Sequence, residues 1–237
     1  ECTREAQATD ARHAVRMGLR FVRSLGRDAA EKVAAGYGSL KWKVGVEPVA
    51  QELAVARCLL ESLPSGVRVR FDANGGLSAI ELEQWLEGLL PFAEQVDFLE
   101  QPLACGEEAA MARSMQESGV AIALDESLNG SGGQRWLEPE AWAGPLVIKA
   151  PLMGDVSRLI SKLAPLARRV VFSSVFETGI GLENSLRLAD ALPELVRPIG
   201  FDTVDAFGDG WNHVVSKPVI CGKDRKQYNA QQIWNWI

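Results

Sequence analysis

Val67-Arg-Val-Arg-Phe-Asp72 is a short run of mostly apolar residues that ends in a carboxylate, and its length and composition are typical of a buried strand. Polar residues close such runs at positions 43, 72, 100, 125, 149 and 173, at intervals of 24 to 29 residues. A seventh run, Pro198-Ile-Gly-Phe-Asp202, ends 29 residues after Ser173. The chain therefore predicts strands at nearly constant spacing. Besides Val67–Asp72 and Pro198–Asp202, the predicted strands are Ser39-Leu-Lys-Trp-Lys-Val, Val96-Asp-Phe-Leu-Glu, Val120-Ala-Ile-Ala-Leu-Asp, Leu146-Val-Ile-Lys and Val170-Val-Phe-Ser-Ser.

The segments between these runs have the periodicity of amphipathic helices. Residues 48–63 carry one apolar stripe, and Ser78-Ala-Ile-Glu81 is a capping-box pattern that opens the next helix. After Asp125, Asn129-Gly-Ser-Gly-Gly133 predicts a flexible loop followed by a short helix. Further helices are predicted over residues 107–118, 155–167 and 182–193.

Regular alternation of strand and helix predicts an α/β fold, a parallel (β/α) TIM-type barrel whose chemistry lies at the carboxyl ends of the strands. A doubly wound open sheet is the competing fold, but no GxGxxG follows the first strand, and polar residues end six successive strands. We expect the first of eight strands near Leu19–Leu25. The predicted domains are a segment of residues 1–18, a barrel over 19–215, and a tail over 216–237 that packs on the barrel.

The composition limits the kinds of partner. The chain has 237 residues, and 31 acidic against 25 basic residues give a net charge of −6, which disfavours nucleic acid. Four cysteines without a CxxC pair indicate neither a zinc site nor a disulfide framework, which favours a reducing cytoplasm. No apolar run approaches the roughly 20 residues of a membrane span, and no signal-peptide layout begins the sequence. We expect a soluble, cytoplasmic protein and leave open a homo-oligomer.

Three acidic residues, Asp72, Glu100 and Asp125, end three consecutive predicted strands. In a barrel these ends lie side by side, so three carboxylates converge and repel one another unless a cation lies between them. An all-oxygen ligand set with room for water and substrate suits Mg²⁺, with Mn²⁺ as a substitute, better than zinc. The alternative is that each acid only caps a strand or begins a loop.

Lysines flank the acids in the predicted strand order. Lys41 and Lys43 are two residues apart on one strand and so share a face, while Lys149 ends the strand that follows Asp125. Proximity to a metal ion and to each other should lower the pKa values of these lysines, so that a neutral lysine serves as a base. The alternative, a lysine that extends outward to solvent, is more credible for Lys41 than for Lys43 or Lys149.

Such a set of groups suits the removal of a proton from a carbon next to a carboxylate. Binding a small-molecule carboxylate to Mg²⁺ stabilises the enediolate, and a lysine on one face takes the proton. A lysine on the other face then donates a proton, giving racemisation, or stabilises the intermediate while a leaving group departs.

Six motifs give the sequence a family resemblance. It resembles the enolase superfamily, and more closely the o-succinylbenzoate synthases of the muconate lactonizing enzyme subgroup. The motifs run in family order over about residues 36–210: Lys-Trp-Lys-Val-Gly (41–45), Phe-Asp-Ala-Asn-Gly (71–75), Leu-Glu-Gln-Pro-Leu (99–103), Leu-Asp-Glu-Ser (124–127), Ile-Lys-Ala-Pro (148–151) and Ser-Ser-Val-Phe-Glu-Thr-Gly-Ile-Gly (173–181).

The resemblance implies a syn dehydration of a cyclohexadiene carboxylate to 2-succinylbenzoate, a step in menaquinone or phylloquinone synthesis. It implies that Lys43 is the general base, with Lys41 beside it, and that Lys149 stabilises the enediolate from the opposite face. Asp72, Glu100 and Asp125 would bind Mg²⁺. The residues implied for substrate contacts are Asn74, Ser173, Ser174 and Gly200.

Two alternatives stay open: an N-acylamino-acid racemase or dipeptide epimerase, which uses the same groups, and a non-catalytic barrel that only binds. The sequence also departs from the family pattern in two places. Ala150 separates Lys149 from Pro151, and the 42 residues before Lys43 leave no room for the family's α+β capping domain. We therefore expect the capping domain to be absent, and apolar side chains to be exposed around the mouth of the barrel.

Overall fold

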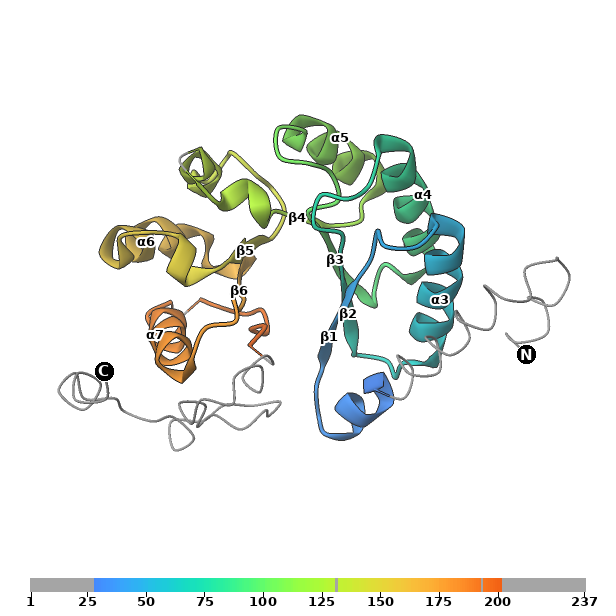
Figure 1. Cartoon of the computed structure of the whole chain (residues 1–237), viewed down its shortest axis with the longest axis horizontal. Helices are drawn as coiled ribbons and strands as arrows, with labels where there is room; N and C mark the ends of the chain where they lie inside the picture. Colours follow the sequence, from blue (N-terminus) through green and yellow to red (C-terminus); the bar gives the residue numbers. More distant parts are fainter. Residues whose placement is uncertain (1–27, 131, 193, 202–237) are drawn as a thin grey trace, which may run out of the picture. The chain divides into compact units, whose positions relative to one another are not determined.

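The computed structural model describes residues 28–130, 132–192 and 194–201 (Figure 1). The chain divides into two compact units, with the boundary between Ile122 and Ala123, and each unit is described by itself. The strand predicted near Leu19–Leu25, the segment 1–18 and the tail 216–237 lie outside the described residues. Residues 28–34 are helical and precede the first described strand.

The first unit is built on a parallel sheet whose strand order in the described part is β1-β2-β3-β4. Figure 1 shows α3 and α4 along one side of this sheet. Its strands are β1 (Ser39–Lys43), β2 (Arg68–Asp72) and β3 (Val96–Glu100), while the two residues of β4 (Ile122–Ala123) lie on either side of the boundary. Its helices are α3 (Val49–Ser62), α4 (Ala79–Leu89), the 3₁₀ turn η1 (Leu90–Phe92) and α5 (Glu108–Ser118). The helices predicted over 48–63 and 107–118 are therefore confirmed.

Alternation along the strands separates an apolar face from a charged face. Trp42 and Phe71 pack edge to face with their ring centroids 5.9 Å apart, and Phe71 meets Trp85 of α4 at 5.4 Å. Successive side chains of a strand point to opposite faces, so the residues flanking Trp42 and Phe71 lie on the face away from α4. Lys41 and Lys43 thus share that face, as predicted.

The register sets the carboxyl ends of the first three strands level with one another. Lys43 pairs with Asp72, and Asp72 pairs with Glu100, each as the last residue of its strand. The register shifts once, between Val69 and Arg70, where β3 has the extra residue Asp97. Two of the three predicted metal ligands therefore lie next to each other on one face of the sheet.

The capping box that opens α4 is present as predicted. The Ser78 hydroxyl accepts from the Glu81 N–H at 3.3 Å, and the Glu81 carboxylate accepts from the Ser78 N–H at 2.8 Å. These bonds from the Ser78 backbone and hydroxyl hold the pKa of Glu81 below its ordinary value. The box satisfies N–H groups that the first turn of a helix otherwise leaves unpaired.

Ser78→Ala should lower the free energy of unfolding by about 1 kcal/mol, because it removes the acceptor for the Glu81 N–H. The pKa of Glu81 is lower in the folded chain than in the unfolded chain. The stabilisation that its ionised carboxylate gives is therefore full above the unfolded pKa, and it is lost as the pH falls through the folded pKa. The loss should therefore be larger at pH 7 than at pH 3 in denaturant titrations. Ser65→Ala, in the exposed turn before β2, is the control, and an equal loss in both variants would contradict the capping role.

The second unit contains a pair of parallel strands, β5 (Leu146–Ile148) and β6 (Val170–Phe172). Single parallel bridges join Leu124 to Leu146 and Ser173 to Gly200. Its helices are α6 (Val156–Leu163) and α7 (Gly179–Asp190). Its 3₁₀ segments are η2 (Glu126–Leu128), η3 (Gly133–Leu137), η4 (Ala150–Leu152) and η5 (Ala164–Arg169).

Three predicted boundaries in this part of the chain were wrong. The α-helix expected over 155–167 ends at Leu163, because Pro165 cannot continue it, and a 3₁₀ turn follows. The helix expected over 182–193 is Gly179–Asp190, so its glycines begin the helix rather than precede it. The strand expected over 120–125 is reduced to Ile122–Ala123, and Asp125 lies beyond it at the start of η2.

Parallel strands alternating with helices confirm part of the predicted architecture. Closure into an eight-stranded barrel stays a prediction, because the described strands form the two sheets above. Within the described ranges, we find no helix with the length and apolar character to cross a membrane.

Candidate active site

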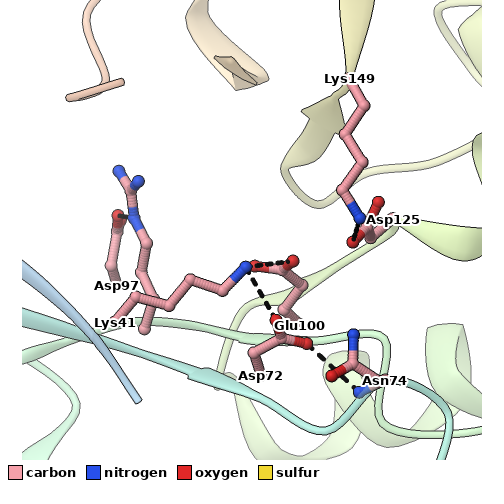
Figure 2. Close-up of polar contacts among 8 residues, drawn as sticks. Lys41, Asp72, Asn74, Asp97, Glu100, Asp125 and Lys149 are labelled. Carbon is pink, nitrogen blue, oxygen red and sulfur yellow. Dashed lines mark hydrogen bonds and ion pairs between the residues drawn. The ribbon is translucent and has the colours of Figure 1, made fainter. Parts of the chain in front are cut away.

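Asp72 and Glu100 form a pair of buried carboxylates at the ends of β2 and β3, with exposed fractions of 7% and 1%. The Lys41 ammonium lies between them, 2.8 Å from Asp72 Oδ2 and 2.7 Å from Glu100 Oε1 (Figure 2). Both carboxylates therefore reach one cation. This arrangement fits a divalent metal ion, because two adjacent carboxylates supply the charge and the oxygen ligands that Mg²⁺ prefers.

The Lys41 side chain is 37% exposed, but its ammonium contacts two carboxylates rather than solvent alone. Burial lowers the pKa of the Lys41 ammonium, but the charges of Glu100 and Asp72 and the hydrogen bonds to them outweigh burial. The pKa of Lys41 is held above its ordinary value, against the lowering that we expected for these lysines. With these two carboxylates as its partners, the ammonium form of Lys41 is favoured over the neutral amine.

Lys43 ends β1 on the same face as Lys41 and is exposed. Its register partner is Asp72, and the next residue, Val44, donates its N–H to the Asp72 carbonyl at 2.8 Å. The backbone that carries Lys43 is thus bonded directly to the backbone of a predicted metal ligand. This places Lys43 at the carboxyl end of the sheet, where the sequence predicts the base.

Asp125 and Lys149 form the corresponding pair in the second unit. Asp125 is 1% exposed, and its Oδ2 accepts from the Lys149 ammonium (Figure 2). Lys149 follows β5 directly and begins the 3₁₀ turn Ala150–Leu152, which contains Pro151. Across residues 28–130, 132–192 and 194–201, no three acidic, histidine or cysteine side chains gather closely enough to bind a metal ion. Convergence of Asp125 with Asp72 and Glu100 therefore stays a prediction.

Asn74 lies in the loop after β2, and its N–H donates to Asp72 Oδ1 at 3.2 Å (Figure 2). Its φ of 46° is in the left-handed region, which asparagine tolerates better than most residues. The next residue, Gly75, donates its N–H to the Gln101 carbonyl at 2.6 Å, and Ala73 donates to the Glu100 carbonyl. The loops after β2 and β3 are therefore bonded to each other, and Asn74 lies next to a predicted metal ligand.

Ser173, Ser174 and Gly200 lie together in the second unit. The Ser174 N–H donates to the Gly200 carbonyl at 3.1 Å, and the Gly200 N–H donates to the Phe172 carbonyl at 2.7 Å. Backbone bonds therefore hold Gly200 alongside the end of β6. Three of the four residues predicted to contact substrate share this one place in the unit.

The Ser174 hydroxyl takes part in a hydrogen-bonded turn within its own loop. It donates to Glu177 Oε2 at 2.6 Å and accepts from the Phe176 N–H at 2.8 Å, while the Val175 N–H also donates to Glu177 at 2.7 Å. Phe176 has a φ of 63°, a strained value for an aromatic residue. Because its one proton goes to Glu177, the Ser174 hydroxyl is an acceptor toward any further group in this conformation.

The enolase C-terminal domain-like family matches residues 24–222 of the sequence. The chain belongs to this family. The o-succinylbenzoate synthase of Thermosynechococcus vestitus is 37% identical over 151 residues, covering 61% of this chain and 46% of the relative. The Enterobacter sp. o-succinylbenzoate synthase is 33% identical over 186 residues, covering 77% and 54%. The chain thus spans about half the length of the curated relatives it matches.

Solved structures agree with this family assignment. The crystal structure of o-succinylbenzoate synthase from Thermosynechococcus elongatus, complexed with Mg in its active site, superimposes with a TM-score of 0.71 at 29% identity. The superposition covers 89% of this chain and 63% of the other. The resemblance predicted from the six motifs is therefore confirmed, and the chain is a member of the enolase superfamily.

Sequence reasoning missed several buried charged residues of this enolase-family domain. Arg70 lies two residues before Asp72, donates from Nε to Asp97 Oδ2 at 2.8 Å, and stacks over the Phe98 ring. The signal was present, because an arginine and an aspartate interrupt otherwise apolar strands. Glu52 was also missed, since a glutamate near a helix start resembles an ordinary solvated residue.

Several large apolar side chains are exposed in segments that follow strands, and their place around a barrel mouth stays a prediction. In the first unit, Val46 follows β1 and is 69% exposed. Ile80, in the first turn of α4, is 70% exposed. In the second unit, exposed apolar residues follow β5 and β6: Leu152, Val156 and Phe176. Each unit therefore carries exposed apolar side chains on loops and helix starts that follow its strands.

Proposed function

We propose that this chain forms the catalytic domain of an o-succinylbenzoate synthase, which dehydrates a cyclohexadiene carboxylate to 2-succinylbenzoate. The observation that carries the proposal is the pair Asp72 and Glu100 sharing one cation at the ends of adjacent strands. The substrate is taken from the curated relatives, whose named activity is o-succinylbenzoate synthase. Mg²⁺ is supported by the related structure that holds Mg in its active site.

Asp72, Glu100 and Asp125 would hold the Mg²⁺ ion, each with a carboxylate almost completely removed from solvent. When bound, the ion would stabilise the negative charge that develops on the substrate carboxylate as the neighbouring proton leaves. Each of these carboxylates already pairs with an ammonium, from Lys41 or Lys149. The three acids are therefore placed to bind a positively charged group.

We assign the proton-transfer role to Lys43. It is exposed at the end of β1, and it shares its face with Asp72, whereas Lys41 is held as an ammonium between two acids. A base must be free to accept a proton, and the Lys41 ammonium contacts two carboxylates at 2.8 and 2.7 Å. Lys149 would stabilise charge on the opposite side of the substrate, from its position directly after β5.

The substrate contacts are assigned to Asn74, Ser173, Ser174 and Gly200. Since the Ser174 hydroxyl proton is used by Glu177, a substrate carboxylate would be bound here by the Ser173 hydroxyl. Ser174 would then shape the loop and accept a hydrogen bond from a substrate donor. Gly200 lies beside Ser173, because an added Cβ there would be in van der Waals contact with the Ser173 hydroxyl oxygen at 3.5 Å.

Racemisation of an N-acylamino acid or a dipeptide is the second candidate, because two lysines flanking a metal site also serve that reaction. The chain should be incubated with Mg²⁺ in D₂O alongside both classes of substrate. Dehydration of the cyclohexadiene substrate with no inversion of amino-acid derivatives is the expected result. Inversion with deuterium incorporation would replace the synthase by a racemase. Binding without turnover, exchange or inversion of any of the substrates would support the non-catalytic barrel.

A further inference from the structure

Glu52 is a buried carboxylate that has no part in the proposed chemistry. It lies in the first turn of α3 and is 4% exposed. Its Oε2 accepts from the Gly45 N–H at 2.8 Å, and its Oε1 accepts from the N–H groups of Val46 and Glu47 at 3.0 and 3.1 Å. Charge-assisted bonds of this kind are stronger than bonds between neutral groups. One side chain thus binds three consecutive backbone donors.

The segment that Glu52 holds begins two residues after Lys43. Between them, Val44 donates its N–H to the Asp72 carbonyl at 2.8 Å. Gly45 has a φ of 77°, and a Cβ on it would lie only 3.3 Å from Leu77 Cδ2. The backbone after Lys43 is therefore bonded to Asp72 at Val44 and to Glu52 at residues 45–47. The turn between these bonds favours glycine at position 45.

We propose that Glu52 is a positioning residue, which fixes Lys43 relative to Asp72 by holding residues 45–47. The proposal rests on the proposed function, in which Lys43 takes the substrate proton near the ion held by Asp72. Lys43 is exposed, so packing alone holds its side chain weakly, and its placement depends on the backbone that carries it. A displacement of about 1 Å at such a group can reduce the rate about 100-fold.

A second buried glutamate, on another helix of the same unit, offers a matched control. Glu108 lies in the first turn of α5, is also 4% exposed, and accepts from the Gly106 N–H with both oxygens at 3.1 Å. Gly106 lies six residues after Glu100, whereas the segment held by Glu52 follows Lys43 almost directly. Both glutamates fasten the loop before their own helix, but only Glu52 holds the backbone next to the base.

Glu52→Gln removes the charge and turns an NH₂ group toward backbone N–H donors, with little change in size. We expect amide hydrogen exchange of residues 45–47 to accelerate at least about tenfold, while kcat falls about 10- to 100-fold and KM changes little. Glu108→Gln should accelerate exchange at residue 106 and leave kcat within about twofold of the starting chain. Melting temperatures of both variants separate these effects from general loss of stability.

Gly45→Ala disturbs the same segment from its other side and serves if Glu52→Gln folds poorly. It should give the same loss of kcat, and the double variant should lose less than the product of the two single losses. If the starting chain turns over, either of two results would overturn the positioning role. One is an equal kcat in Glu52→Gln and Glu108→Gln, and the other is unchanged amide hydrogen exchange at residues 45–47 in Glu52→Gln. A chain with no turnover before any substitution would instead refute the proposed function, and the role with it.

Discussion

Glu100→Gln should weaken Mg²⁺ binding at least about 100-fold and abolish turnover while the fold is retained. Loss of a group that only supports a metal ligand typically lowers affinity 10- to 100-fold, so loss of a ligand charge should cost at least as much. The substitution keeps the size of a side chain that is 1% exposed. It also leaves the Lys41–Asp72 ion pair in place, so the Lys41 ammonium keeps one of its two carboxylate partners.

Titration calorimetry with Mg²⁺ and thermal unfolding of the same samples would check this result. Glu83→Gln makes the same change at an exposed position of α4 and should alter neither quantity. If Glu100→Gln bound Mg²⁺ as tightly as the starting chain does, Glu100 would not be a ligand. The carboxylates of Asp72 and Glu100 would then lie together only to bind the Lys41 ammonium.

The strands of the first unit could be predicted from the sequence because their ends are marked chemically. Lys43, Asp72 and Glu100 each close an apolar run, and each is the last residue of its strand. The capping box at Ser78 marked the start of α4 in the same local way. Local patterns of this kind depend on a few neighbouring residues, so a single sequence is sufficient to find them.

The features that depend on distant contacts could not be predicted in this way. Sequence alone could not show that Lys41 rather than Lys43 contacts the two acids, because both lysines share one face of β1. Asp125 lies two residues beyond β4, where the strand gives way to a 3₁₀ turn. The three donors of Glu52 are backbone groups, and a backbone N–H has no signature in a sequence.

Lys43→Ala should lower turnover about 10²- to 10⁴-fold, which is the contribution typical of a general base. It should also remove exchange of the α-proton with solvent, because both readouts require the same proton transfer. Lys149→Ala should be severely impaired as well, since stabilisation of a developing negative charge is typically worth several kcal/mol.

Lys41 is the residue that could be confused with the base, and its geometry gives it a different expected signature. Its ammonium lies between Asp72 and Glu100 and contacts both carboxylates, whereas Lys43 is exposed at the end of β1. Lys41→Ala should therefore change Mg²⁺ affinity together with turnover, because it removes a positive charge from two of the proposed ligands.

Steady-state turnover, proton exchange in D₂O and Mg²⁺ affinity, measured on the three lysine variants, distinguish these roles. Lys43→Ala should retain Mg²⁺ affinity and respond to added methylamine, since a small amine can replace a missing lysine base. Lys162→Ala is the control, because Lys162 pairs with Glu138 on the surface of the second unit. Turnover that survived in Lys43→Ala would move the base to Lys149 or Lys41. Survival of exchange in Lys41→Ala and its loss in Lys149→Ala would then identify Lys149 as the residue that takes the proton.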